Sequence, residues 1–588
     1  MLRIFKYLRA KEWLMALVCV AFIVGQVWLD LMLPDYTKDL TELITTNVTD
    51  MSDVWNVGGK MLLCTLGSVL LSVATGFFAS KIAAGFSRRL RSNIFRKVSA
   101  FSMEEINKFS TSSLITRTTN DVIQIQLLIA MGLQVMIKGP ILAVWAILKI
   151  LGKSWQWTAA TGVALGVLFI LIFIATVFAF PKFKKVQTYN DNLNRVTREN
   201  LMGIRVVRAY NAEGYQQEKF EKANDDLTRT HLFIGRVMAS MLPGMGMILS
   251  GLPLAIYWVG AIIINEALDP EAKIDLMKNM VAFSSYAIQV IMAFVMMVMI
   301  FIIAPRASVS AKRINEVLDT QPRIKEGRLE RGKIGVQGEV EFKNVSFRYP
   351  DAADYVLKNI SFTARKGEVV AFIGSTGSGK TTLINLIPRF YDATDGEVII
   401  DGENVRNYQL SALYDKIGYV SQKAFMFSGT VASNVAYGDS DEVDYTEEDI
   451  KKAVAIAQAD EFVSRMKNTY EAPIAQDGGN LSGGQKQRLS IARAICRDPE
   501  IYIFDDSFSA LDYKTDRILR AELKKTTEDK TTLIVAQRIG TIKNADKIIV
   551  LDEGEMVGIG THKELLKNCE VYRQIALSQL SEEELENE

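Results

Sequence analysis

The chain has 588 residues, of which 49% are hydrophobic and 23% charged, so more than one domain is expected, with one part in a membrane. Its formal net charge of +1 gives no electrostatic reason to expect nucleic acid as a partner. The four cysteines are scattered without metal-site spacing, which is typical of a reducing compartment rather than of a disulfide framework.

The N-terminal half contains six long apolar runs. Before them, basic and apolar residues are mixed from Met1 to Lys11, which predicts an amphipathic elbow helix at a membrane surface. A run of about 20 apolar residues is long enough to cross a bilayer. The predicted spans are Trp13–Leu33 and, approximately, Val57–Gly85, Ile123–Leu151, Trp155–Phe180, Phe233–Asn265 and Met280–Ala304. Any one of them alone would fit a buried soluble helix, but six in succession predict a six-span helical transmembrane domain over residues 1–318. No acid inside the spans stands out as a counter-charge for a substrate.

The distribution of basic residues predicts the orientation of the spans. Lysine and arginine crowd after the second and fourth spans, whereas the segment Pro34–Asn56 carries mostly acids, so both termini are expected in the cytoplasm of a cell-membrane protein. The two cytoplasmic connections are long and helix-rich, as rods that transmit force would be, with Phe101–Phe109 and Arg208–Phe220 as candidate contact tips. Residues 319–337 form a polar linker.

The soluble region, residues 338–580, contains a phosphate-binding loop and is followed by an acidic tail, residues 581–588. The pattern G-x-x-x-x-G-K-[ST] follows the apolar strand Glu368–Ile373 and precedes a helical segment. Its residues are Gly374, Ser375, Thr376, Gly377, Ser378, Gly379, Lys380, Thr381 and Thr382. Backbone N–H groups and a helix N-terminus hold phosphate there, Lys380 adds a cation and the Thr381 hydroxyl suits Mg²⁺. A Gly-rich turn without ligand is the alternative, and the strand–loop–helix context argues against it.

Two further motifs point to phosphate chemistry. The apolar strand Ile501–Phe504 ends in Asp505 and Asp506, and acids at the carboxyl end of a parallel strand are placed to face the phosphates. Asp505 is therefore a candidate Mg²⁺ ligand, although paired acids also serve as ordinary caps. The run Leu481-Ser482-Gly483-Gly484-Gln485 precedes a second helix and forms a second candidate anion site.

Together these motifs resemble the ATP-binding cassette (ABC) exporters of bacteria, and the resemblance covers essentially the whole chain. It implies an α/β P-loop (RecA-like) nucleotide-binding domain with a helical subdomain, and two such domains that sandwich ATP head to tail. By this resemblance Tyr349 stacks on adenine, Gln422 joins the Mg²⁺ shell, Ser482, Gly483, Gly484 and Gln485 act in trans as the signature, and Asp512 belongs to the D-loop Ser509–Asp512.

Two positions depart from the family pattern. Asp506 stands where the family has a catalytic glutamate, and Gln537 stands where it has a switch histidine. Aspartate is one methylene shorter, about 1.5 Å, whereas a general base must lie within about 2.6–3.2 Å of its water. The chain's own ATP site is therefore expected to hydrolyse poorly. Its intact signature would complete the site of a different half-transporter that carries the glutamate and the histidine.

The predicted function is thus that of one subunit in a heterodimeric ATP-driven exporter. Met292, Met296, Met297 and Met299 in the last span suit amphiphilic or drug-like substrates, although ordinary packing explains them equally well. The open alternatives are a homodimeric lipid or peptide exporter and, of another class, a nucleotide-gated channel. The six spans argue against a soluble cassette protein.

Overall fold

The computed structural model describes residues 2–45, 51–350, 352–438 and 445–580. The chain divides into two compact units, each with its own core. The membrane unit comprises residues 1–98 and 112–320, and the soluble unit comprises residues 99–111 and 321–588. The predicted acidic tail, residues 581–588, and the side chains of Met299 and Phe301 lie outside what is described.

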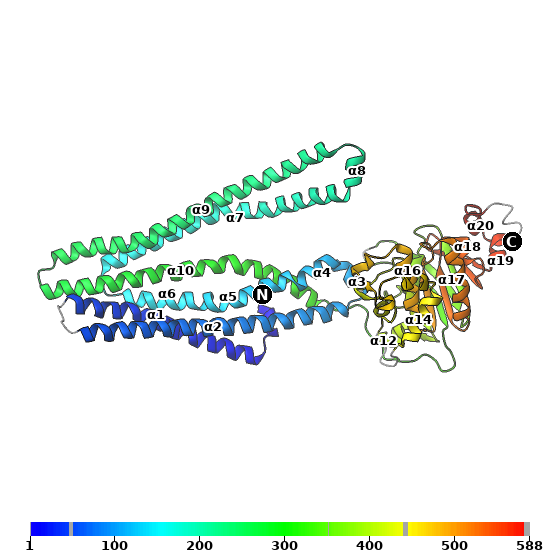
Figure 1. The fold of residues 1–588 in the computed structure, drawn as a ribbon, viewed down its shortest axis with the longest axis horizontal. Helices are drawn as coiled ribbons and strands as arrows, with labels where there is room; N and C mark the ends of the chain where they lie inside the picture. Colours follow the sequence, from blue (N-terminus) through cyan, green and yellow to red (C-terminus); the bar gives the residue numbers. More distant parts are fainter. Residues whose placement is uncertain (1, 46–50, 351, 439–444, 581–588) are drawn as a thin grey trace. The chain divides into compact units, whose positions relative to one another are not determined.

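The membrane unit is built from long helices (Figure 1). Six helical segments within the described residues are long and apolar enough to cross a membrane, as predicted. They are α1 (Ala10–Thr45), α2 (Met51–Ser99), the segment Thr111–Ile150, α7 (Trp155–Met202), α9 (Glu213–Glu266) and α10 (Pro270–Asp319). The third segment consists of α4 (Thr111–Thr118), α5 (Asn120–Met131), the π-helix η2 (Gly132–Met136) and α6 (Ile137–Ile150). A short helix, α8 (Ile204–Ala209), joins α7 to α9.

The N-terminal elbow differs from the prediction. Leu2–Tyr7 forms a 3₁₀ helix, η1, instead of an amphipathic α-helix, and α1 begins only at Ala10. The backbone N–H of Arg9 donates to the Glu12 carboxylate at 3.0 Å, and Glu12 also pairs with Arg89 of α2. A carboxylate that caps the first turn fixes the start of α1 and separates it from the preceding segment.

The membrane helices also extend beyond their apolar runs. The segment Pro34–Asn56, expected to be a connection, is helical up to Thr45 and again from Met51. Polar contacts hold this extension: Lys149 of α6 pairs with Asp35 at 2.6 Å, and the Tyr286 hydroxyl of α10 donates to the same carboxylate at 2.5 Å. Hydropathy therefore located the spans but not the ends of the helices.

One ion pair inside the membrane unit involves an acid that the sequence analysis did not single out. Asp30 lies within the predicted span Trp13–Leu33, and its carboxylate is 3.1 Å from the ammonium of Lys138 on α6. A single charge hardly changes the mean hydropathy of a span. The pair became recognisable only when α1 and α6 were packed together.

The soluble unit contains a six-stranded sheet with the order β12–β11–β3–β10–β9–β6. Its strands are β12 (Glu555–Gly560), β11 (Lys547–Asp552), β3 (Val369–Gly374), β10 (Thr531–Val535), β9 (Ile501–Asp505) and β6 (Ile417–Val420). Neighbouring strands are parallel, except that β12 is antiparallel to β11. The central strands β9 and β10 are apolar runs buried on both faces, as in the covered sheet of an α/β domain, whereas the edge strand β12 is partly exposed.

A second sheet, a hairpin-like strand pair and several helices complete the soluble unit. The second sheet has the order β2–β1–β4–β5, and β7 pairs with β8. Its strands are β2 (Leu357–Ala364), β1 (Val340–Phe347), β4 (Asp395–Ile400) and β5 (Glu403–Asn404), and the pair is β7 (Gly429–Thr430) with β8 (Pro473–Ile474). The helices are α11 (Lys380–Asn385), α12 (Leu410–Asp415), α13 (Val431–Val435), α14 (Glu447–Ile456), α15 (Asp460–Ser464), α16 (Gly483–Cys496), α17 (Tyr513–Thr526), α18 (Ile539–Ile542), α19 (His562–Asn568) and α20 (Glu570–Leu577).

The segment that was predicted to be a linker packs on the soluble unit through its backbone. The N–H of Gly327 donates to the Tyr408 carbonyl at 2.9 Å, and the N–H of Lys333 donates to the Asp401 carbonyl at 2.8 Å. A Cβ on Gly327 would lie 2.0 Å from the Asn407 carbonyl oxygen, so only glycine permits this approach. Residues 327–333 are therefore held against the segments on either side of β5, at residues 401 and 407–408.

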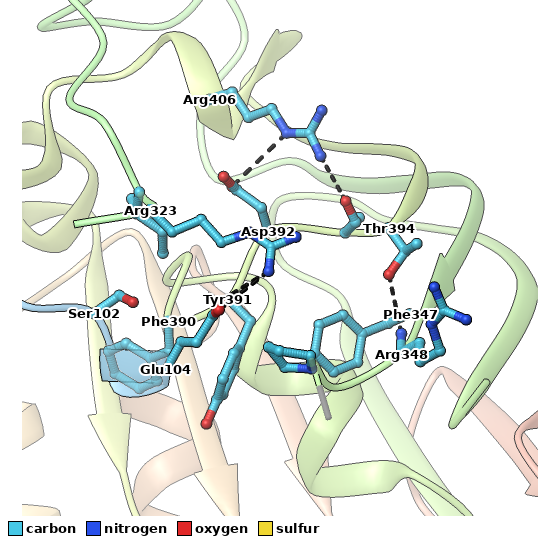
Figure 2. Close-up of a pocket in the computed structure, with 13 residues that line it drawn as sticks. Ser102, Glu104, Arg323, Phe347, Arg348, Phe390, Tyr391, Asp392, Thr394 and Arg406 are labelled. Atoms are coloured by element: carbon cyan, nitrogen blue, oxygen red, sulfur yellow. Dashed lines mark hydrogen bonds and ion pairs between the residues drawn. The ribbon is translucent and has the colours of Figure 1, made fainter. Parts of the chain in front are cut away.

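The predicted contact tip Phe101–Phe109 is confirmed as a contact of the soluble unit. It forms α3 (Met103–Phe109), and the Asn107 amide donates to the Tyr391 hydroxyl at 3.0 Å. Figure 2 shows the adjoining pocket of about 310 Å³, in which Arg323 pairs with Glu104 at 3.1 Å. The second predicted tip, Arg208–Phe220, lies in α8 and α9 of the membrane unit and stays a prediction.

Candidate nucleotide site

The register of the parallel strands brings the predicted motifs to one edge of the sheet. Val535 at the end of β10 lies between Phe372 of β3 and Asp505 of β9. The phosphate loop follows β3, the acids end β9 and Gln537 follows β10. Because carboxyl ends of parallel strands share an edge, three motifs that are distant in sequence become neighbours.

The phosphate loop is closed around the Lys380 side chain. Its ammonium donates to the carbonyl oxygens of Gly374 at 2.9 Å and Ser375 at 2.7 Å. Gly379 has a φ of +95° just before α11, a conformation that favours glycine. Burial lowers the pKa of Lys380 from its ordinary value, and the charges of Asp506 and Asp505 oppose that shift. The loop therefore holds a desolvated cation beside a helix N-terminus, an arrangement that suits phosphate.

Thr381 and Asp505 form the candidate metal position. The Thr381 hydroxyl donates to Asp505 Oδ1 at 3.0 Å, and Thr381 is exposed while Asp505 is buried. Burial raises the pKa of the Asp505 carboxyl above its ordinary value, the hydrogen bond from Thr381 lowers it, and the charge of Asp506 raises it. A hydroxyl and a carboxylate side by side are oxygen ligands of the kind Mg²⁺ prefers, so these residues fit the ion.

Asp506 is engaged by two amide side chains. Gln537 Nε2 donates to Asp506 Oδ2 at 2.9 Å, and Gln422 Nε2 donates to the same oxygen at 3.3 Å. Burial raises the pKa of Asp506, whereas the Gln422 hydrogen bond and the charge of Arg538 lower it. A cavity of about 270 Å³ borders Asp506, Gln537 and Arg538. The structure thus directs the Gln422 amide nitrogen toward Asp506, an interaction that the motifs by themselves did not indicate.

The signature motif forms the N-terminus of α16. Ser482 is its N-cap: its hydroxyl accepts from the Gln485 N–H at 3.3 Å, and the Gln485 side chain accepts from the Ser482 N–H at 2.8 Å. Ser482 and Gly483 are exposed, and no hydrogen bond among the described residues joins residues 482–485 to the phosphate loop. The motif therefore presents a preformed helix end at the surface.

The other predicted site residues lie beside these elements. The Tyr349 hydroxyl is 3.0 Å from the Thr382 hydroxyl, and its ring meets Tyr391 edge to face. Asp512 caps α17 by accepting from the Thr515 N–H at 3.0 Å, and these hydrogen bonds lower its pKa. Tyr349 is thus close to the phosphate loop, while Asp512 has a local structural role.

The fold and this edge of the sheet define a membrane exporter half with an attached ATPase domain. Residues 14–294 match the ABC transporter transmembrane region, and residues 357–509 match the ABC transporter domain. The chain is 40% identical over 533 residues to an uncharacterized ABC transporter ATP-binding protein of Mycobacterium tuberculosis, with 90% of each chain covered. It belongs to the ABC transporter family.

Other relatives and one solved structure extend this comparison. An ATP-dependent lipid A-core flippase of Pseudomonas aeruginosa is 31% identical, covering 91% of this chain and 87% of the flippase. An uncharacterized ABC transporter protein, YfiB of Bacillus subtilis, is 34% identical with 91% of each chain covered. A bacterial Atm1-family ABC exporter with ATP bound shares the fold, with a TM-score of 0.75, 21% identity, and coverage of 98% of this chain and 99% of that one. The chain is therefore an ATP-driven ABC exporter half-transporter and a membrane protein.

Proposed function

We propose that this chain is the subunit with the degenerate ATP site in a heterodimeric exporter. The observation that carries the proposal is the hydrogen bonding of Asp506, whose Oδ2 accepts from both Gln537 and Gln422. A general base must direct a lone pair at its water, and amide donors on the carboxylate compete for that lone pair. The aspartate side chain is shorter than that of glutamate and places the carboxylate further from the water, and no histidine is present at residue 537.

The remaining site residues have proposed roles that rest on the family resemblance and are supported by their positions around the phosphate loop. Lys380 and the loop N–H groups would hold the β- and γ-phosphates, and Tyr349 would stack on adenine. Thr381 and Asp505, with Gln422, would hold Mg²⁺, which when bound neutralises charge on the phosphate oxygens. The exposed Ser482–Gln485 helix end would bind the γ-phosphate of ATP held by the partner subunit, with Asp512 near the contact.

A second subunit is also supported by the far end of the α7–α9 hairpin. Large apolar or aromatic side chains near α8 are exposed: Met202 by 82%, Val206 by 60%, Tyr210 by 80% and Tyr215 by 68%. Met202 is 22 residues beyond the predicted end of the fourth span, or about 33 Å of helix, too far for lipid to cover it. A partner's soluble domain would bury this group and receive the predicted tip Arg208–Phe220.

Amphiphilic or drug-like compounds are the proposed substrates, moved outward by alternating access with both termini in the cytoplasm. ATP shifts the equilibrium only through its higher affinity for the closed pair. A homodimeric lipid exporter is the second candidate, because relatives at about one-third identity are named as lipid A-core flippases. In that case Asp506 would serve as a working base in two identical sites.

The experiment that tests the proposal is ATP hydrolysis by the purified chain in nanodiscs, alone and co-expressed with half-transporters that carry the glutamate and histidine. We expect slow turnover alone, and fast turnover with a partner that is abolished by changing the partner's glutamate. Fast turnover by the chain alone, with two copies per nanodisc, would establish the homodimer instead.

A further inference from the structure

The ion pair between Asp30 and Lys138 lies inside the membrane unit, where charged side chains are rare and usually functional. We propose that this pair binds the headgroup of a zwitterionic amphiphile. The inference names a substrate class for the exporter and therefore rests on the proposed function.

Four helices meet at the pair. Lys138 Nζ of α6 lies 3.1 Å from Asp30 Oδ2 of α1, and the Ser68 hydroxyl of α2 donates to Asp30 Oδ1. Gln289 of α10 donates from Nε2 to the Asp30 backbone carbonyl at 3.1 Å. Asp30 and Lys138 lie within the first and third predicted spans. The network is therefore a polar site inside an apolar helical bundle.

The site has unused hydrogen-bonding capacity. The side chains of Asp30 and Lys138 remain 25% and 18% exposed, so the pair is not sealed by protein. Gln289 Oε1 is buried and has no donor among the described residues. Lys138 has three N–H donors, and within the described chain its ammonium donates to Asp30 alone. A spare acceptor on Gln289 and spare donors on Lys138 thus belong to two side chains that both contact Asp30.

The helix that carries Lys138 is irregular at this point. The π-helical turn Gly132–Met136 ends two residues before it, and Pro140 follows it within α6. π-helical turns interrupt the regular i→i−4 ladder and frequently occur at functional sites. A Cβ on Gly139 would lie 3.1 Å from Met297 Cγ, so α6 and α10 cross closely beside the pair. The local backbone thus places Lys138 at a helix crossing with a loosened hydrogen-bond ladder.

The pairing of charges selects the substrate class. A singly charged cation that binds Asp30 leaves Lys138 unpaired in a medium of low dielectric constant, and an anion that binds Lys138 leaves Asp30 unpaired. Leaving one member of such a pair uncompensated is strongly unfavourable. A zwitterion replaces the Asp30–Lys138 contact by two new pairs, with its ammonium toward Asp30 and Gln289 Oε1 and its phosphate toward Lys138. Its hydrocarbon tail stays in the bilayer.

The test compares three probes with the same tail: dodecylphosphoethanolamine, dodecylammonium and dodecyl phosphate. Binding to the full chain in nanodiscs is measured without ATP by native mass spectrometry, so the result does not depend on turnover or on the partner subunit. We expect the zwitterionic probe to bind about tenfold more tightly than either charged probe. Equal binding of all three probes would overturn the inference while leaving the proposed function intact.

Single substitutions then give a result that a purely structural pair would not. Lys138→Met leaves Asp30 alone and should shift the preference to the cationic probe, whereas Asp30→Asn should shift it to dodecyl phosphate. The matched control is Lys149→Met, because Lys149 pairs with Asp35 between the same two helices, and it should leave the preference unchanged. Should either single variant fail to fold, the exchange variant Asp30→Lys with Lys138→Asp keeps both charges. It should still bind the zwitterionic probe more tightly than either charged probe. An unchanged order of probes in folded single variants, or loss of the zwitterion's advantage in a folded exchange variant, would refute the assignment.

Discussion

Restoring the two departures from the family pattern should turn the chain's own site into an efficient ATPase. The change is Asp506→Glu together with Gln537→His, in a chain that already has an intact phosphate loop and signature. Glutamate extends the carboxylate by about 1.5 Å, and a misplacement of about 1 Å can cost about 100-fold in rate. Two copies of the variant would form two competent sites.

The hydrogen bonds of Asp506 make a second contribution to the expected increase in hydrolysis rate. Gln537 donates to Asp506 Oδ2 at 2.9 Å, and a hydrogen bond to a charged group contributes about 1.5–3 kcal/mol. Removing the Gln537 hydrogen bond from the carboxylate should raise the rate by at most about 10- to 100-fold, since about 1.4 kcal/mol corresponds to a factor of ten. We therefore expect the double variant to hydrolyse ATP at least about 100-fold faster than the unmodified chain alone.

One opposing effect comes from the backbone. Asp506 has a φ of +45°, in the left-handed region that aspartate tolerates better than most residues. Glutamate there should cost roughly 1 kcal/mol of stability, visible as a lower Tm but not as a lower rate per folded molecule.

The assay is Mg²⁺-dependent phosphate release by the purified chain in nanodiscs, with each single substitution measured separately. Lys380→Met in the double-variant background is the control for contaminating ATPases and should abolish the gain. If the unmodified chain alone already turns over at about 10 s⁻¹, and the double variant adds nothing, then the reasoning about Asp506 is wrong.

Three further predictions concern single residues. Lys380→Met should weaken binding of a fluorescent ATP analogue by about tenfold or more, because the buried ammonium is the loop's only charged donor in the described structure; unchanged affinity would contradict this role. Asp505→Asn should abolish the effect of Mg²⁺ on nucleotide affinity and raise the Tm of nucleotide-free protein at neutral pH. Burial raises the pKa of Asp505, so the side chain contributes fully to stability below the ordinary aspartate pKa of about 4, and this contribution is lost as pH rises. The Tm difference between the variant and the unmodified chain should therefore vanish below that pH. Asn434→Ala should destabilise the soluble unit by about 2–4 kcal/mol, because the buried side-chain amide of Asn434 forms hydrogen bonds with Phe427, Thr430 and Arg493. A Tm within a degree of that of the unmodified chain would show that other groups replace these hydrogen bonds.

Much of the site was predictable from local sequence. Glycines and Lys380 at fixed spacing predict a phosphate loop, because the glycines permit the backbone conformation that the loop needs. The two acids at the end of an apolar strand predict that Asp505 lies at the same edge of the sheet as this loop. The contact of α3 with the rest of the soluble unit was indicated only by its mid-loop position, since nothing in residues 101–109 identifies Tyr391 as their partner.

What the sequence determined by itself is local: the length of each apolar run, the motifs, and the absence of a glutamate at residue 506 and a histidine at residue 537. What only the tertiary structure decided is which distant side chains share a hydrogen bond. Gln422 and Gln537 are 84 and 31 residues from Asp506, and the parallel register of β6, β9 and β10 makes them its neighbours. Asp30 and Lys138 are 108 residues apart in apolar runs, where a single charge is hidden in the mean hydropathy, and the packing of α1 on α6 pairs them. Spacing along the chain fixes local backbone geometry, but contact between remote side chains depends on strand register and helix packing.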